Sequence, residues 1–402
     1  MDRRHFIRVI GGGSIIAATV VSQSGCSALS SGFPPAAVEA WQGPSAEDTD
    51  PRRRALAYAI TAPNPHNLQP WLVDLREANA ITVYTDRERV LPETDPLGRQ
   101  ILIGHGAFIE LLAIALASQG LAAHVTLWPQ GELPATLKDW DKRPVARIAL
   151  TPAAAGSPPD ALFKQILMRH TPKTDFDAAR NVSPDTLQTL LDSVGIVGSR
   201  PGIRAAGAVD AARLQPLRDL CWQSAKVELS TPRTMMESIK LIRLGPDEIL
   251  QHRDGISINS PFVRAMGNVG MFDRSTPPAE GSAGYKNAMG RFEGHSRTAT
   301  GFVWLSTPGN SRSQQIDAGR AYVRLQLAAT AIGLGVHPMS QALQEFAEMK
   351  PFYDKAHQLM LGKPAPQTPG DETLQMFCRL GYTADAVPAT PRRQIDKFVL
   401  TA

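Results

Sequence analysis

Cysteine is scarce in this chain: the 402 residues include three, at positions 26, 221 and 378. Three thiols are too few for a disulfide framework or a zinc site, so we interpret Cys221 and Cys378 as buried small apolar groups. No Gly-x-Ser-x-Gly sequence and no metal-ligand spacing occurs, which leaves a hydrolase or a metal centre without support. Aromatic residues make up 6% of the chain and are not interleaved with any cluster of Lys and Arg. We therefore expect no nucleic-acid partner.

A strong excess of either charge is also absent. The formal net charge is +4, and Arg3, Arg4 and Arg8 against Asp2 account for +2 of it. A hydrophobic content of 43% and a charged content of 20% are ordinary for a soluble globular protein. A chain of this length can form one large domain or two medium domains with a full hydrophobic core.

The apolar stretch near the amino terminus, from Val9 to Val21, is too short for a membrane-spanning helix. It follows Arg3-Arg4-His5-Phe6-Ile7-Arg8, which matches the twin-arginine export signal. We therefore expect residues 1–27 to be a signal peptide for the twin-arginine export machinery. The protein would be periplasmic, or anchored on the outer side of the inner membrane. This route carries folded proteins that typically receive a cofactor in the cytoplasm, which favours redox chemistry.

Cys26 leaves two alternatives open for the end of this signal. It follows Ser24-Gly25, as the lipidated cysteine of a lipoprotein signal would, although Gln23 stands where such a signal has an aliphatic residue. Lipidation would attach the protein to the membrane. Simple cleavage nearby, for instance after Ala28, would release it.

The rest of the chain divides into two halves. Residues 28–49 mix Ser, Gly, Pro and Ala without periodicity, which indicates a flexible tether. A stretch rich in Ala, Gly and Pro separates a first half over 50–155 from a second half over 156–402. Periodicity predicts helices at 54–60, 101–118, 160–170, 184–194, 205–227, 318–332 and 346–361, and strands at 72–75, 80–85, 121–128, 145–150, 300–306 and 375–380. The pattern is lost between 231 and 291, and an irregular stretch of that length is typical of a lid or a binding loop.

The two halves repeat one pattern. A shift of 213 positions places Gly106 on Gly319, Leu112 on Leu325, Ala115 on Ala328, Gly120 on Gly333, Leu121 on Leu334 and His124 on His337. In each half a long apolar helix ends at a glycine and leads to a segment with a histidine. We interpret this repeat as an internal duplication, so that one chain forms a pseudo-dimer and supplies its own dimer-like interface.

The most distinctive segment is Ala62-Pro63-Asn64-Pro65-His66-Asn67-Leu68-Gln69-Pro70-Trp71. Its three prolines exclude a helix interior and predict a rigid loop. Its carboxamides, histidine and indole are able to meet the edge of a flat polar heterocycle with donors and acceptors. Two interpretations remain at this point: the loop grips a planar ligand, or it is a proline-rich turn in which Trp71 anchors the core.

Other segments carry polar groups that suit an anionic or electron-accepting ligand. Arg169-His170-Thr171-Pro172-Lys173 offers a guanidinium fork, a hydroxyl and a point charge that together would wrap a phosphate. Arg379 lies in an otherwise apolar strand and needs a partner, for which a phosphate is suitable. His337-Pro338-Met339-Ser340-Gln341 follows a glycine-ended helix, where a loop would present backbone N–H groups to an electron-accepting atom.

In combination, these segments resemble the nitroreductase family of FMN flavoproteins. The loop from Pro63 to Trp71 is similar to that family's P-S-S-x-N-x-Q-P-W loop, and Arg169-x-Thr171-x-Lys173 is similar to its R-x-S-x-R/K element. The segment from Cys378 to Tyr382 resembles its closing phosphate-contacting strand. The layout is most similar to the Acg-type branch, in which one chain holds two nitroreductase-like halves. The resemblance implies an α+β fold of three layers, α/β/α, with mostly antiparallel central sheets flanked by helices.

The resemblance also implies a cofactor and its contacts. One composite FMN site per chain is expected, because the proline loop matches only in the first half and the phosphate element only in the second. The ring would lie against Pro63, Asn64, Pro65, His66, Asn67 and Gln69, its N5 atom against Pro338, Met339, Ser340 and Gln341, and its tail on Arg169, Thr171, Lys173 and Arg379. Two departures from the family pattern are Pro65, which removes a backbone donor, and Met339-Ser340, which replaces a Glu-Gly pair.

For function, the resemblance implies an exported FMN oxidoreductase. NAD(P)H or another donor would pass a hydride to flavin N5, and the flavin would reduce a nitro, quinone or similar acceptor. The protein itself would supply no obligatory acid or base. The alternative is an FMN-sequestering or storage protein, in which the insertion over 231–291 covers the flavin as a lid.

Overall fold

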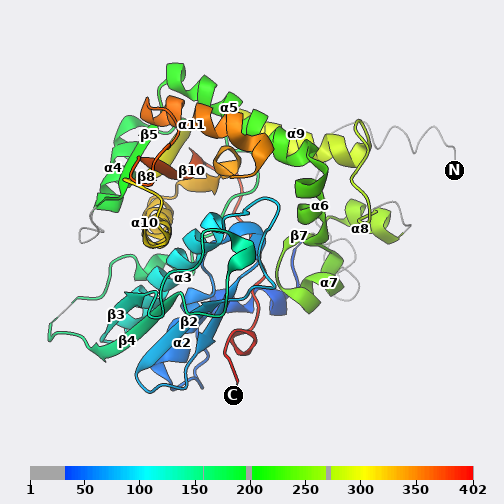
Figure 1. The fold of residues 1–402 in the computed structure, drawn as a ribbon. Helices are drawn as coiled ribbons and strands as arrows, with labels where there is room; N and C mark the ends of the chain where they lie inside the picture. Colours follow the sequence, from blue (N-terminus) through cyan, green and yellow to red (C-terminus); the bar gives the residue numbers. More distant parts are fainter. Residues whose placement is uncertain (1–31, 157, 196–201, 269–272, 402) are drawn as a thin grey trace.

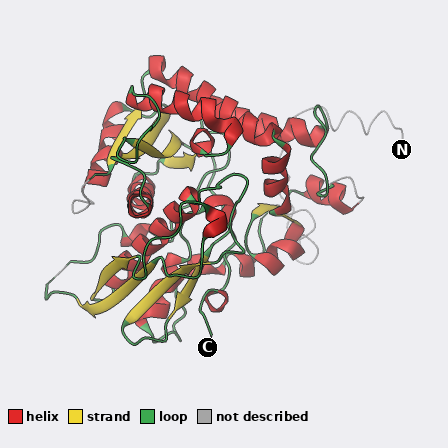
Figure 2. Cartoon of the chain, viewed as in Figure 1, coloured by secondary structure: helices red, strands yellow, loops and turns green. Residues whose placement is uncertain are grey.

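The computed structural model describes residues 32–156, 158–195, 202–268 and 273–401. The expected signal peptide over 1–27, with Cys26, lies outside these residues. Two antiparallel sheets of four strands each form the centre of the described part, and two long helices lie between them (Figures 1 and 2). The expected α+β class with mostly antiparallel sheets is therefore confirmed.

The first half is one unit of sheet and helices. Its elements are α2 (Pro51–Ala59), β1 (Trp71–Asp74), β2 (Ala80–Thr85), α3 (Arg99–Ala117), β3 (Leu121–Leu127) and β4 (Ala146–Pro152). The strands pair in the order β1-β2-β4-β3, and every pairing is antiparallel. By length and composition α3 could cross a membrane, but it is buried along most of its length. It is therefore the core helix of this half.

The second half follows the same course. Its elements are α4 (Pro184–Gly195), β5 (Arg204–Ala208), β8 (Gly301–Thr307), α10 (Arg312–Ala331), β9 (Gly335–Pro338), α11 (Lys350–Leu361) and β10 (Thr373–Gly381). The pairing order β5-β8-β10-β9 has the topology of β1-β2-β4-β3 and is again antiparallel. Each core helix lies between the second and third strands of its own copy. The duplication predicted from the sequence repeat is therefore confirmed.

The two core helices cross at a pair of glycines. A Cβ atom on Gly106 would lie 2.0 Å from the Ile316 carbonyl oxygen, and one on Gly319 would lie 1.9 Å from the Ile103 carbonyl oxygen. The shift of 213 positions that relates Gly106 to Gly319 also relates Ile103 to Ile316, so each copy contributes the same surface. Only glycine lets the backbones of α3 and α10 approach this closely. The seam between the halves is therefore a pseudo-twofold interface.

Arginines at the start of both core helices extend this symmetry. Arg99, the first residue of α3, donates through both terminal nitrogens to the Leu343 and Gln375 carbonyls of the second half, at 2.6 Å each. Arg312, the first residue of α10, donates to the Leu97 carbonyl of the first half at 2.7 Å. Each half is thus hydrogen-bonded to the other from the same position of its core helix.

The insertion of the second half is helical. It consists of α5 (Ala211–Ser230), α6 (Pro232–Lys240), β6 (Ile242–Leu244), α7 (Gly245–His252), β7 (Ile256–Ile258), α8 (Pro261–Asn268) and α9 (Ala283–Arg297). The prediction of irregular structure over 231–291 was wrong for the described residues. Pro232, Pro246 and Pro261 do not break helices there, because each stands in the first turn of a helix, where proline is favourable. The helix expected over 205–227 also begins later, because Asp210 caps α5 and the residues before it form β5.

Both ends of the described chain pack against the first half. A flexible tether was expected over 28–49, and all residues after 155 were expected to belong to the second half. Residues 35–42 form two short 3-10 helices, η2 (Pro35–Ala37) and η3 (Glu39–Gln42), and the Trp41 indole donates to the Thr390 carbonyl at 2.8 Å. Near the carboxyl end, Val73 of β1 exchanges hydrogen bonds of 2.8 Å with Phe398 and Leu400. The described residues before 50 and residues 393–401 therefore belong to the folded body.

Candidate functional site

The proline loop leaves α2 and carries strained backbone. His66, Asn67 and Gln69 adopt positive φ angles of 47°, 54° and 54°. The Asn64 side chain stabilises this conformation, because its Oδ1 accepts the Gln69 backbone N–H at 2.8 Å. Left-handed conformations of non-glycine residues cluster at functional sites, where the surrounding structure stabilises them. The loop therefore has the character of a site rather than of an ordinary turn.

The loop also anchors the core, so the two interpretations of its sequence are not exclusive. Trp71, directly after the loop, is fully buried and stacks on Phe108 of α3 with ring centroids 4.7 Å apart. Gly104 of α3 lies under the loop, where an added Cβ atom would contact Asn64 at 3.2 Å. Packing of the loop onto the central helix explains why it can hold strained angles.

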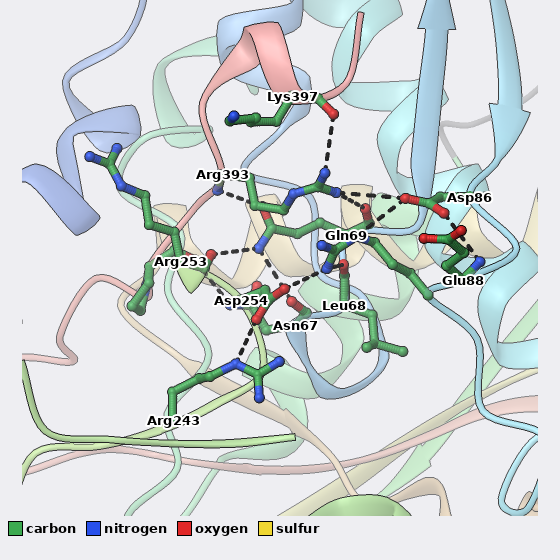
Figure 3. A network of polar contacts seen from close by, with 12 residues as sticks. Asn67, Leu68, Gln69, Asp86, Glu88, Arg243, Arg253, Asp254, Arg393 and Lys397 are labelled. Atoms are coloured by element: carbon green, nitrogen blue, oxygen red, sulfur yellow. Dashed lines mark hydrogen bonds and ion pairs between the residues drawn. The ribbon is translucent and has the colours of Figure 1, made fainter. Parts of the chain in front are cut away.

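The carboxamides of Asn67 and Gln69 have different partners from those expected of residues that face a ring. Asn67 donates to the Pro391 carbonyl at 3.0 Å and accepts from the Arg392 guanidinium at 2.6 Å. Gln69 is fully buried, donates to the Arg253 carbonyl at 2.9 Å and accepts from the Arg393 backbone N–H at 2.9 Å. These side chains bind the loop to the insertion and to the carboxyl-terminal segment (Figure 3). The contact of Asn67 and Gln69 with a ring stays a prediction, and both carboxamides already have protein partners.

A buried carboxylate completes the attachment of the insertion. Asp254 is 2% exposed and pairs with Arg89 of the first half and with Arg243 of the insertion, whose Nε lies 2.8 Å from Oδ1 (Figure 3). The Gly255 backbone N–H donates to the Asn67 carbonyl at 3.2 Å. Two cations on one buried carboxylate compensate the cost of its desolvation. Hydrogen bonds therefore connect the insertion directly to the proline loop.

Arg169 meets the proline loop from the other half. Its side chain is buried, with Nη2 donating to the Thr61 carbonyl at 2.8 Å and Nη1 to Thr171 Oγ1 at 3.2 Å. Its Nε has no partner among the described residues. Desolvation by burial lowers the pKa of Arg169 to about 10. Arg169 thus contacts Thr61, the residue directly before the proline loop, and a shared ligand site of the two segments stays a prediction.

A second buried guanidinium, that of Arg392, lies beside the first. Its Nη2 donates to the same Thr61 carbonyl at 3.1 Å, and its Nε has no partner in the described part of the chain. Burial, followed by the positive charge of Arg169, lowers the pKa of Arg392 to about 9. Both guanidiniums lie over the Trp41 ring, at 5.6 Å for Arg169 and 5.2 Å for Arg392.

Neither arginine forms an ion pair with a carboxylate of the described residues. The His170 ring packs against Trp41 at a tilt of 59° with ring centroids 4.4 Å apart, and its Nδ1 is buried without a partner among the described residues. Two uncompensated buried cations are costly unless an anion joins them. Paired guanidiniums suit the bidentate recognition of a phosphate. Arg169, Arg392, Trp41 and His170 therefore form a candidate anion subsite.

Sequence reasoning identified Arg169 but missed Arg392 and Trp41. The sequence signal for Arg392 was the pair Arg392-Arg393, which lies in a proline-rich terminal segment. Trp41 gave no signal, because residues 28–49 lack periodicity.

Arg379 has other partners than the expected phosphate. It is fully buried, and it donates through Nε to His337 Nδ1 at 2.9 Å, through Nη1 to the His295 carbonyl at 2.9 Å and through Nη2 to the Thr174 carbonyl at 2.6 Å. Each of its three nitrogens thus already donates to a protein acceptor. The need for a partner was predicted correctly, but the partner is protein. Arg379 holds the segment after Lys173 in place.

Lys173 lies between the loop and this arginine network. Its side chain is exposed and forms no hydrogen bond with the described residues, while its carbonyl accepts from His295 Nε2 at 3.0 Å. Desolvation, followed by the charges of Arg291 and Arg392, lowers its pKa to about 8. Desolvation and the charge of Lys173 lower the pKa of His66 to about 4, so this imidazole is neutral at pH 7. A free cation therefore stands next to the proline loop.

The loop after β9 offers fewer free polar groups to a ligand than the sequence predicted. Met339 is buried, and its backbone N–H donates to the Phe377 carbonyl at 2.9 Å. Ser340 Oγ accepts from the Phe377 backbone N–H at 3.0 Å and donates to the Phe377 carbonyl. Pro338 is part of β9, paired with Cys378. The Gln341 side chain contacts Glu228, and its buried Oε1 has no partner among the described residues.

Of the corresponding cations of the first half, Arg52 and Arg53 pair with carboxylates, and Arg54 donates to the Ser45 and Asp48 carbonyls. Arg52 pairs with Asp50 and donates to the Leu75 carbonyl at 2.8 Å, and Arg53 pairs with Asp48 and Asp396. Most of the second-half segment that would face them, over 197–201, lies outside the described residues. In the described part, the uncompensated anion subsite occurs on one side of the pseudo-twofold seam only.

Comparison with known proteins gives relatives along most of the chain. No family model matches it. A protein of Mycobacterium tuberculosis strain H37Rv named "Putative NAD(P)H nitroreductase acg" is 27% identical over 361 residues, which cover 87% of this chain and 95% of the relative. A second protein of that strain, named "Putative NAD(P)H nitroreductase Rv3131", is 24% identical over 363 residues, which cover 88% of this chain and 92% of the relative.

Among solved structures, the FMN-dependent nitroreductase NfnB from Mycobacterium smegmatis in complex with NADPH aligns with a TM-score of 0.37 and 18% identity. It covers 60% of this chain and 96% of its own. A nitroreductase with bound FMN from Bacteroides fragilis aligns with a TM-score of 0.34 and 13% identity, over 60% of this chain and 99% of its own. The named relatives support a relationship of this chain to the nitroreductase-like family.

Proposed function

We propose that this chain is an FMN-dependent oxidoreductase of the nitroreductase type, with one composite flavin site in the seam between its halves. The observation that carries this proposal is the buried pair Arg169 and Arg392, which lacks a carboxylate among the described residues and leaves both Nε atoms without partners there. A phosphate would offset the charge of this pair and accept hydrogen bonds from the two Nε atoms, since the terminal nitrogens of both arginines already donate to protein acceptors. The names of the relatives point to the same cofactor class.

The chain's own groups define where FMN would lie. Arg169, Arg392 and the Thr171 hydroxyl would hold the phosphate. Neutral His66 and the strained loop would contact the ring, and Lys173 would place a positive charge at its edge. When bound, FMN would supply hydride acceptance and donation between a nicotinamide or other donor and a nitro, quinone or similar acceptor. The proposal assigns no obligatory acid or base to the protein.

The test compares FMN with riboflavin, which lacks the phosphate. We expect the wild-type protein to be yellow, to bind one FMN per chain and to prefer FMN over riboflavin. In R169Q and R392Q this preference should fall by about 10- to 100-fold, since a hydrogen bond to a charged group contributes about 1.5–3 kcal/mol. R143Q is the control, because Arg143 is paired with Asp141 on the surface. A colourless wild type, or an unchanged preference in both variants, would refute the site.

A sequestering role is the second candidate, and the fastened insertion favours it. Asp254 ties the insertion to the proline loop, so access of a donor to the ring would require the insertion to move. Anaerobic titration with NADPH separates the two functions. Loss of the flavin absorbance at 1:1 stoichiometry would indicate turnover. Absorbance that persists with NADPH, and is lost with dithionite, would indicate sequestration.

Export to the periplasm is part of the proposal, supported by the twin arginines at Arg3 and Arg4. Replacement of both by lysine should retain the protein in the cytoplasm, and cell fractionation measures this. Attachment through a lipid on Cys26 would be shown by incorporation of labelled palmitate that is lost in C26S. Release of unlabelled protein into the periplasm would support cleavage instead.

A further inference from the structure

The described chain begins against the helical insertion. The Gly32 carbonyl accepts a hydrogen bond from the Nδ2 atom of Asn259, which is buried between β7 and α8. The short helix η2 then packs against α7, and Glu39 of η3 pairs at 2.6 Å with Arg253, the residue directly after α7. The amino-terminal segment therefore lies along the insertion, and the chain that precedes Gly32 joins the folded body beside α8.

Large apolar side chains are exposed at the same place. Leu250 of α7 is 41% exposed and Phe262 of α8 is 65% exposed, and we call these two residues the α7–α8 face. The two helices are neighbours, because a Cβ atom on Gly245 of α7 would lie 3.6 Å from the Arg264 side chain of α8. Phe262 follows Asn259 by three residues, a span of at most about 10 Å. Both helices lie on the opposite side of the molecule from α4 and β5 (Figure 1).

The length of chain before Gly32 limits the distance between this face and a lipid anchor. Cys26, the residue that the sequence offers for lipidation, precedes Gly32 by six residues. Six residues span at most about 20 Å when they are fully extended. A membrane held by a lipid on Cys26 would therefore lie within about 20 Å of the hydrogen bond between Gly32 and Asn259, and α8 would be among the elements nearest to it.

The charges of this part of the insertion favour an apolar contact with the bilayer. Three arginines are paired with carboxylates: Arg243 with Asp254, Arg253 with Glu39 and Arg274 with Glu248. Attraction to anionic lipids depends on clusters of Lys and Arg that are available to the headgroups. A contact through Phe262 depends on the removal of apolar surface from water instead, and it should change little with salt.

We propose that the α7–α8 face is the surface that this protein turns towards the membrane, with Phe262 inserted at the boundary between lipid headgroups and acyl chains. The inference rests on the proposed lipid attachment at Cys26 and is independent of the flavin. One lipid chain alone gives marginal, reversible binding, and a second contact with the bilayer makes the attachment stable. Phe262 supplies that contact, because transfer of an aromatic side chain out of water is favourable. The insertion thus orients the protein on the membrane.

The experiment places the mature, lipidated protein on phosphatidylcholine vesicles. F262C and I332C are each labelled with an environment-sensitive fluorophore, which the buried thiols of Cys221 and Cys378 do not take up. Ile332 is the matched control, because it is 42% exposed at the end of α10, outside the insertion. We expect nitroxide-labelled lipids to quench the fluorophore at position 262, with a blue shift of its emission, at low and high salt alike. The fluorophore at position 332 should keep its intensity.

The outcomes separate the membrane surface from the lipid attachment. A lipidated protein with no quenching at position 262, or with equal quenching at positions 262 and 332, would overturn the surface alone. A protein without a lipid on Cys26 that leaves both fluorophores unquenched would overturn the attachment and the surface, whatever its flavin content. A blue shift at position 262 that depends on protein concentration, without vesicles, would assign the face to a second copy of the chain and overturn the membrane contact. If F262C does not fold, A265C on the same side of α8 takes its place, with the same outcomes.

Discussion

Replacing Gly106 by Ala tests the pseudo-twofold seam on which the composite site depends. The added methyl group would lie 2.0 Å from the Ile316 carbonyl oxygen and 2.9 Å from the Gly319 Cα atom. An ordinary contact between carbon and carbonyl oxygen is about 3.3 Å or longer, so α3 and α10 would have to separate by roughly 1 Å. A gap of that size forfeits about a quarter to a half of each dispersion contact across the seam. We expect a loss of about 3 kcal/mol in the free energy of unfolding.

Chemical denaturation, followed by circular dichroism, measures this free energy. G319A should cost about as much as G106A, because its methyl group meets the Ile103 carbonyl oxygen at 1.9 Å. The double variant should cost less than the sum of the two, since either alanine already separates the helices. G290A is the matched control: Gly290 lies within α9 with no atom near its added Cβ, so alanine should stabilise by about 0.5–1 kcal/mol.

The FMN affinity provides an independent readout of the same change. Separation of the halves should move Thr61 relative to Arg169, so G106A should also bind FMN more weakly than G290A does. A loss of less than about 0.5 kcal/mol in both G106A and G319A, or strict additivity in the double variant, would refute the close approach of the two helices.

Three further perturbations follow from the described contacts. D254N removes the carboxylate that Arg89 of the first half shares with Arg243 of the insertion, although Arg89 keeps its pair with Asp86. The insertion should detach and proteolysis within residues 240–260 should accelerate, whereas D396N, at a carboxylate exposed to 80%, should behave as wild type. Burial raises the pKa of Glu228 to about 7, so folding favours its protonated form. The free energy of unfolding should therefore fall by up to roughly 3 kcal/mol as the pH rises from about 4.5 to 7. Urea titrations at each pH measure this loss, which should be smaller in E228Q. W41A removes the ring beneath Arg169 and Arg392 and should weaken FMN binding with a smaller effect on riboflavin, and equal losses for both flavins would contradict this geometry.

The sequence by itself determined the elements whose signals are local. Apolar periodicity located both core helices, and a glycine at the same position of each repeat indicated the duplication before any contact was known. The three prolines predicted a rigid loop, and the isolated charge of Arg379 predicted that it needs a partner. These signals are read from residues close together in the chain, where backbone preferences and side-chain period act directly.

Only the tertiary structure decided which groups meet. Asn67 is paired with Arg392, a residue 325 positions away, and Gln69 is enclosed by the insertion and the carboxyl-terminal segment. Arg379 found protein acceptors, whereas Arg392 and Arg169 came to lie together without a carboxylate partner among the described residues. The physical reason is that desolvation and pairing depend on which distant surfaces pack together. Local preference sets the elements of this protein, and the packing of its two halves sets the charge balance of the site.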